Sequence, residues 1–113
     1  MDKKRTQAAI NSQFLQAAHS GDLSQLVLAR LDGADVNSVH PQTGLQALHF
    51  AVGTNDLLMI RYLTEQCNAV FGPDRSGRWP TIIAAECKVD DAVGDYIVEA
   101  EAAYLKKTGQ LAP

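Results

Sequence analysis

A period of 33 residues runs through most of this chain. Three segments align with one another, beginning at Phe14, Ala47 and Pro80. The recurring positions are Ala17, Ala51 and Ala84, then Leu26, Ile60 and Val93, and then Gly44 and Gly77. The first interval is 34 residues and not 33, which one extra residue around His40-Pro41 explains. A period of this length predicts stacked units that each contact only their neighbours.

Each unit reads as a short helix, a turn, a longer helix and a polar loop that contains Gly or Pro. The recurring alanines are small enough for the first helices of neighbouring units to approach closely. Asp22, Asp56 and Asp90 come at or just before each second helix. There a carboxylate can cap free N–H groups and complement the helix dipole.

Three motifs recur in register: Gly33-Ala34-Asp35-Val36-Asn37, then Gly44 with Leu48-His49-Phe50-Ala51, and then Gly77 with Trp79-Pro80 and Ala84. With these motifs the chain resembles the ankyrin repeat over roughly residues 12–105. The resemblance implies an all-α fold, an ankyrin-type stack of helix-turn-helix repeats with short hairpin loops. About three units are present, of which the first and the last are degenerate.

We expect a single domain over residues 1–113. Within it, residues 12–37 form an N-capping repeat, 38–71 a central repeat and 72–108 a C-capping repeat. The last unit ends in an extended helix from about Val89 to Thr108, whose acidic start is expected to be a solvent-facing cap.

Two positions depart from the family pattern. The turn that is Gly21 in the first unit is Asn55 in the second and Lys88 in the third. Asn tolerates a positive φ angle fairly well but Lys does not, so the third turn is expected to be distorted. Asn68 is expected to take the left-handed position at the end of the central repeat.

Composition narrows the class of function. Of the 113 residues, 46% are hydrophobic and 20% are charged, which is typical of a folded, soluble domain. The net charge of −3 gives no footprint for nucleic acid. Lys3-Lys4-Arg5 is not followed by an apolar run, and no stretch is long enough to span a membrane. We therefore expect a cytoplasmic protein, monomeric or homo-oligomeric, with Cys67 and Cys87 reduced.

His49 is the residue that most invites a catalytic interpretation. In the ankyrin pattern this histidine is structural, because it hydrogen-bonds backbone groups of neighbouring loops. No evident nucleophile or acid accompanies it in the sequence. The resemblance assigns structural roles to Gly33, Gly44, His49, Ala51, Gly77, Pro80 and Ala84.

A metal- or thiol-dependent enzyme is the alternative from a different class. His40, His49, Cys67 and Cys87 could supply zinc ligands by number, but their spacing matches no usual ligand pairing. There is no phosphate-binding glycine motif, and nothing indicates a lowered thiol pKa. We expect no cofactor, no metal and no enzymatic activity.

The preferred hypothesis is a module that binds another protein through the concave face of the stack, as an inhibitor or regulator. Trp79 lies in the predicted hairpin tip between Arg75 and the third inner helix, and Trp and Arg often carry binding energy. Trp79 could instead simply cover the end of that helix. The candidate binding residues are Gln42, Thr43, Leu45, Thr54, Arg75, Ser76, Arg78, Trp79 and Glu86. A third hypothesis is self-assembly through an incompletely capped end.

Overall fold

The computed structural model describes residues 5–110, which form six α-helices and one π-helix. The helices are α1 (Gln7–Ser20), α2 (Leu23–Leu31), α3 (Ala47–Gly53), α4 (Leu57–Arg61), η1 (Tyr62–Gln66), α5 (Pro80–Cys87) and α6 (Asp91–Lys107). Within this part of the chain there is no strand, only an isolated antiparallel bridge between Val39 and Gln46. The all-α prediction is confirmed. Lys3 and Lys4 lie outside the described residues.

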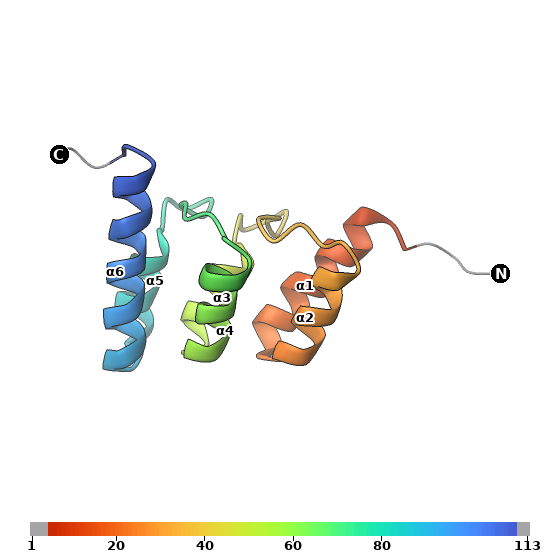
Figure 1. Ribbon diagram of the computed structural model, residues 1–113, viewed down its shortest axis with the longest axis horizontal. Coiled ribbons are helices and arrows are strands. Elements are labelled where there is room, and N and C mark those ends of the chain that lie inside the picture. Colours follow the sequence, from red (N-terminus) through yellow and green to blue (C-terminus); the bar gives the residue numbers. More distant parts are fainter. Residues whose placement is uncertain (1–4, 111–113) are drawn as a thin grey trace.

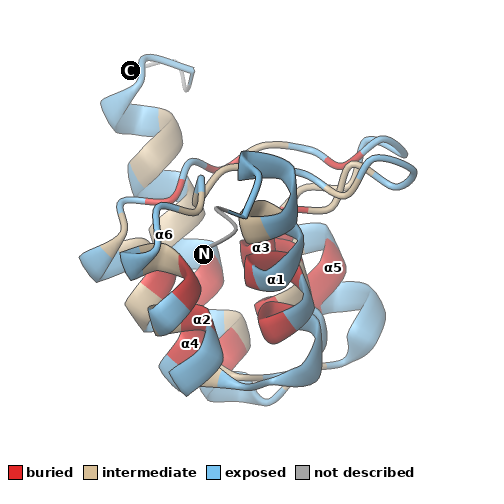
Figure 2. Ribbon diagram, turned by 90° about the vertical axis from the view of Figure 1, so that its right-hand side faces the viewer, coloured by how far each residue is buried: buried red, intermediate tan, exposed pale blue. Residues whose placement is uncertain are grey.

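The helices form three pairs that stack side by side (Figure 1). The inner helices α1, α3 and α5 form one row, because α1 packs on α3 and α3 packs on α5. The outer helices α2, α4 and α6 form the second row (Figure 2). The hairpins that join the units, residues 38–45 and 72–79, project to the side of the inner helices. This is the helix-turn-helix stack that the repeat predicts.

One hydrophobic core runs through all three units. Ala17, Ala51 and Ala84 are buried between the inner helices, where larger side chains would hold the helices apart. Leu26, Ile60 and Val93 are buried on the outer helices. Burial of each such aliphatic side chain contributes roughly 1.5–3 kcal/mol to folding. The recurring positions of the sequence are therefore the positions that hold the stack together.

The predicted aspartate caps occur in two of the three units. Asp22 accepts a hydrogen bond from the Gln25 backbone N–H, and Asp56 accepts one from Met59, each at 3.1 Å. Asp90 precedes α6, but its carboxylate makes no capping bond. Its own N–H donates to the Asn55 side chain at 2.9 Å, so this residue links two turns instead.

The expected distortion of the third turn is wrong. Lys88 has φ +51°, close to +61° at Asn55 and +74° at Gly21. The backbone bonds that close the turn are kept, although the last is longer: 3.3 Å from Val89 N to Ala84 O, against 3.0 Å for Asp56 N to Ala51 O. Lys88 therefore adopts the left-handed conformation at a conformational cost. Asn68, at φ +53°, takes the left-handed position as predicted.

The repeat lengths are balanced by small local changes. The first hairpin bond joins His40 N to Leu45 O, whereas the second joins Asp74 N to Arg78 O across one residue fewer. The extra residue predicted near His40-Pro41 is thus in the hairpin tip. The π-helix η1 holds a further extra residue in the central unit, because Ala69 N bonds Leu63 O where Ala34 N bonds Ala29 O in the first unit. The connection from Ala69 to the hairpin bond at Asp74 is correspondingly shorter than that from Ala34 to His40.

Candidate functional site

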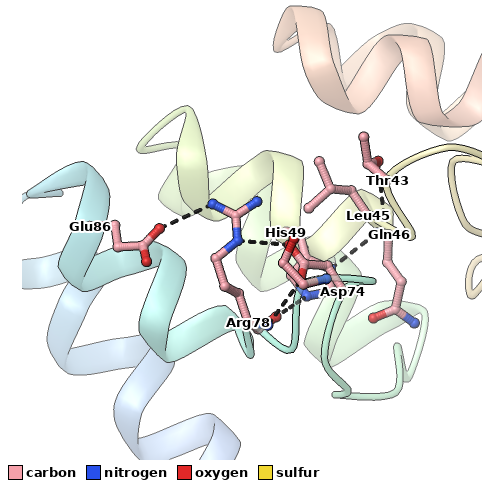
Figure 3. A network of polar contacts seen from close by, with 8 residues as sticks. Thr43, Leu45, Gln46, His49, Asp74, Arg78 and Glu86 are labelled. Carbon is pink, nitrogen blue, oxygen red and sulfur yellow. Dashed lines mark hydrogen bonds and ion pairs between the residues drawn. The ribbon is translucent and has the colours of Figure 1, made fainter.

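His49 links the central unit to the next hairpin (Figure 3). It lies in the first turn of α3 and is only 1% exposed. Its Nδ1 accepts a hydrogen bond from the Gln46 backbone N–H at 3.1 Å. Nε2 therefore carries the proton, and it donates to the Arg78 carbonyl at 3.1 Å. Both ring nitrogens are engaged with the backbone, which supports the structural role that the resemblance implies.

The electrostatic setting of His49 favours its neutral form. Burial lowers the pKa of His49, while its bond to the Arg78 carbonyl and the nearby Asp74 carboxylate oppose this shift. A general base needs a free nitrogen within reach of a substrate proton. His49 offers none, so it holds two backbone segments together and is not arranged for proton transfer.

Asp74 organises the second hairpin, and the sequence interpretation missed it. Its buried carboxylate accepts bonds from the backbone N–H groups of Ser76 and Arg78 at 2.8 and 2.9 Å, and from Arg78 Nε at 2.9 Å. Burial raises the pKa of Asp74, but the bonds from Arg78 and Ser76 outweigh it and the pKa is lowered overall. The sequence signal is DRSG, an aspartate that opens a glycine turn.

His40 has the corresponding place in the first hairpin. Its Nδ1 accepts bonds from the backbone N–H groups of Gln42 and Thr43 at 3.3 and 3.4 Å. The two hairpin tips also contact each other, because Arg75 N–H donates to the Thr43 carbonyl at 2.9 Å. The hairpins therefore form one connected edge and not two independent loops.

We define the concave face as the inner helices together with both hairpins. On this face a groove runs between α1 and the first hairpin. Its volume is about 520 Å³. Leu15, Val39, Leu45 and Phe50 supply apolar surface to it. Val39 is 49% exposed, so much of its side chain forms apolar surface at the mouth of the groove. At one end, the rings of His19 and Phe50 pack with their centroids 5.1 Å apart.

Only some of the predicted binding residues come together at this groove. Thr43 and Leu45 line it, and Arg75 lies beside Thr43. Gln42 and Ser76 are exposed on the two hairpin tips. Thr54 does not belong to this cluster, because it caps the far end of α3, where its hydroxyl donates to the Phe50 carbonyl at 3.0 Å.

Three of the predicted binding residues already make contacts within the fold, namely Arg78, Glu86 and Trp79. Arg78 bonds Glu86 at 3.1 Å as well as Asp74, so its charge is already paired (Figure 3). Trp79 is half-buried against the core, and its carbonyl accepts the first backbone bonds of α5. This placement favours a role for Trp79 in covering the helix start, while a smaller part of the residue stays exposed for contact. Pro80 follows at the first position of α5, where its missing N–H costs no bond.

The residues proposed for metal or thiol chemistry are dispersed. Among residues 5–110, no three His, Cys, Asp or Glu side chains gather as a metal ion would require. Cys67 is half-buried, and burial raises the pKa of its thiol, which disfavours the nucleophilic thiolate. Cys87 is exposed on α5 and is not bonded to Cys67. None of the helices over the described range is both long and apolar enough to cross a membrane.

Three stacked helix pairs with hairpins projecting from one edge define a helical-repeat protein, a class that presents an extended recognition surface. A family model of ankyrin repeats matches residues 14–107 with three copies. The chain therefore belongs to the ankyrin repeat family, whose members are generally modules for protein–protein interaction. No curated protein matches the sequence significantly.

The sequence interpretation missed the groove itself. Val39 reads as an ordinary hairpin residue, and Leu15 and Phe50 read as core. Their shared surface arises only when α1 and the first hairpin are placed in space. The weak signal available was a valine between polar neighbours in the stretch Ser38 to His40.

Proposed function

We propose that this protein binds a protein partner through its concave face and acts on that partner as a regulator or inhibitor, without catalysis of its own. The observation that carries the proposal is the groove beside Val39. It combines exposed apolar surface with polar groups at its rim, which is the usual composition of a recognition site.

Preorganisation supports the same proposal. His49 fixes the second hairpin to the central unit, Asp74 braces that hairpin from within, and Arg75 N–H joins the two tips. A partner that binds such a surface needs to order few loops, so less of the interaction free energy is lost on binding. The recognition surface is therefore formed before the partner arrives.

Affinity capture from the organism that encodes the chain tests this proposal. We expect Val39→Asp to lose a captured partner, because it places a carboxylate in the apolar part of the groove. Leu58→Asp is the matched control, since Leu58 is 74% exposed on the outer helix α4. Both variants should keep the wild-type circular dichroism spectrum. Equal capture by Val39→Asp and wild type would exclude the groove as the binding site.

A further inference from the structure

The groove of the concave face has an unusual charge environment for an acidic protein. The chain carries 13 Asp and Glu against 10 Lys and Arg. No Asp or Glu of the described residues lines the groove, whereas two histidines, His19 and His40, do. The groove between α5 and α6 is the contrast, because Asp91, Asp95 and Glu99 line it.

The carboxylates of the second hairpin and of the helix that follows it are already paired, whereas the exposed Asp35 precedes the first hairpin and accepts a bond from the Asn37 backbone N–H. Asp74 is buried and accepts three hydrogen bonds, two from backbone N–H groups and one from Arg78. Glu86 is paired with the same guanidinium at 3.1 Å. Neither group is available to attract a cation from a partner, so neither offsets a positive charge at the hairpin tips.

Arg75 supplies that positive charge. It is exposed at the tip of the second hairpin and forms no ion pair with any residue between 5 and 110. Its backbone N–H is fixed to the Thr43 carbonyl, and Thr43 lines the groove. The backbone of Arg75 is therefore fixed beside a residue of the groove, and its exposed side chain is long enough to reach the rim. An arginine in this position can bind a carboxylate with two parallel hydrogen bonds.

A histidine at the groove can also donate a hydrogen bond to an acceptor. His40 receives two backbone N–H groups on Nδ1, so its proton is on Nε2, which has no partner in the described part of the chain. The Ser38 hydroxyl also makes no hydrogen bond there, but its oxygen is buried beneath the surface of the groove. The groove thus combines an apolar floor with an unused imidazole donor beside it.

We propose that the groove and Arg75 bind a partner segment in which an apolar side chain is flanked by carboxylates. The apolar side chain packs against Val39 and Phe50, and the carboxylates meet Arg75 and the Nε2–H of His40. This inference rests on the proposed function, since it names the chemistry of the partner at the same face.

The inference can be tested by selecting from a library of displayed random dodecapeptides on the immobilised protein at low salt. We expect the selected peptides to be enriched in Asp and Glu on both sides of a large apolar residue. Arg75→Glu should weaken the best peptide about tenfold or more, because it replaces an attractive charge by a repulsive one. Lys106→Glu is the control, since it changes the net charge equally but lies at the end of α6.

Each other outcome has a defined meaning. Groove-dependent peptides of neutral or basic composition would overturn the charge inference and leave the proposed function standing. Peptides that bind the Val39→Asp and Arg75→Glu variants as tightly as wild type would overturn both the charge inference and the proposed function. Failure to enrich any sequence would overturn the inference as well. Two further probes are tested separately as controls for general anion binding: vesicles that contain phosphatidylserine, and a single-stranded oligonucleotide. Equally tight, Arg75-dependent binding of either would show that general anion binding had been mistaken for peptide recognition.

Discussion

At the residue scale, His49 shows how a reactive side chain can be committed to structure. Its position after Leu48 is read directly from the repeat, and the resemblance assigns it to backbone bonding. What the sequence could not provide is the identity of the bonded groups, since Arg78 lies 29 positions away. The partner is set by the stacking of units, which local pattern does not encode.

Replacement of His49 by Gln should keep one of its two hydrogen bonds and remove the other. A Gln side chain at this position can still accept from the Gln46 N–H, but it does not reproduce the bond to the Arg78 carbonyl. We expect a loss of about 1–3 kcal/mol in the free energy of unfolding, because a buried carbonyl loses its donor. Urea denaturation followed by circular dichroism measures it. An unchanged midpoint would contradict the structural role.

The same residue predicts a dependence of stability on pH. Burial lowers the folded-state pKa of His49 below its ordinary value of 6.5. The unfolded chain then binds the proton more readily than the folded one, so the free energy of unfolding falls as pH drops below about 6.5. Comparison of denaturation midpoints at about pH 7.5 and 5.5 should show this loss in wild type. In His49→Gln the loss should be smaller, and an equal loss would contradict the assignment.

Gly44 is required both by its conformation and by its neighbour. Its φ is +72°, and a Cβ atom there would lie 2.7 Å from Arg75 N in the second hairpin. Gly77 also has a positive φ, +83°, but a Cβ atom added to Gly77 would have no neighbour within 4 Å. Gly77 is therefore the matched control. We expect Gly77→Ala to cost about 1 kcal/mol from backbone strain alone, and Gly44→Ala to cost clearly more. Equal midpoints for the two variants in urea would show that the tips do not pack as described.

At the element scale, the π-helix η1 is the least predictable part of the fold. The apolar pattern from Leu57 onward predicts an ordinary helix, and one inserted residue changes that pattern very little. Two neighbouring helices hold η1 in place. Arg30 on α2 bonds the Tyr62 hydroxyl and the Gln66 carbonyl, and the Tyr96 hydroxyl on α6 donates to Glu65 at 2.6 Å. Long-range contacts therefore decide a local conformation here.

The turn between α5 and α6 offers a direct test of strain in an element. Lys88 has the left-handed conformation that Gly21 has in the first unit. Lys88→Gly should therefore stabilise the protein by about 0.5–1 kcal/mol, because it removes the steric cost of a side chain at positive φ. A rise of a few degrees in the melting temperature would report it. A lower melting temperature would mean that the Lys88 side chain makes a stabilising contact.

At the scale of the whole molecule, the repeat in the sequence predicts the architecture well and the binding surface poorly. Period, buried alanines and turn residues are local properties that recur, so three units reinforce one another. The groove depends on where α1 meets a hairpin that follows it by some twenty residues, and Arg75 joins it from the next unit. The pairing of Arg78 with Asp74 was not predicted, because Asp74 was not recognised as a buried acceptor.

The charged side chains are distributed unevenly over the whole molecule. Exposed carboxylates gather along α6, while the hairpin edge carries Arg75 and His40. A second copy stacked by this same face of α5 and α6 would bring like charges together, and their repulsion opposes such a contact. Sedimentation at high protein concentration and low salt should therefore show a monomer. A stable dimer under those conditions would favour self-assembly over partner binding.

The central claim, recognition of a protein partner by the concave face, is tested most directly by hydrogen–deuterium exchange of the complex with the captured partner. The account predicts slower exchange on partner binding in α1, in residues 38–45 and at the tip around Arg75. It predicts no change in α4 or in the outer face of α6. Protection confined to the outer helices, with unchanged exchange in the hairpins, would contradict it.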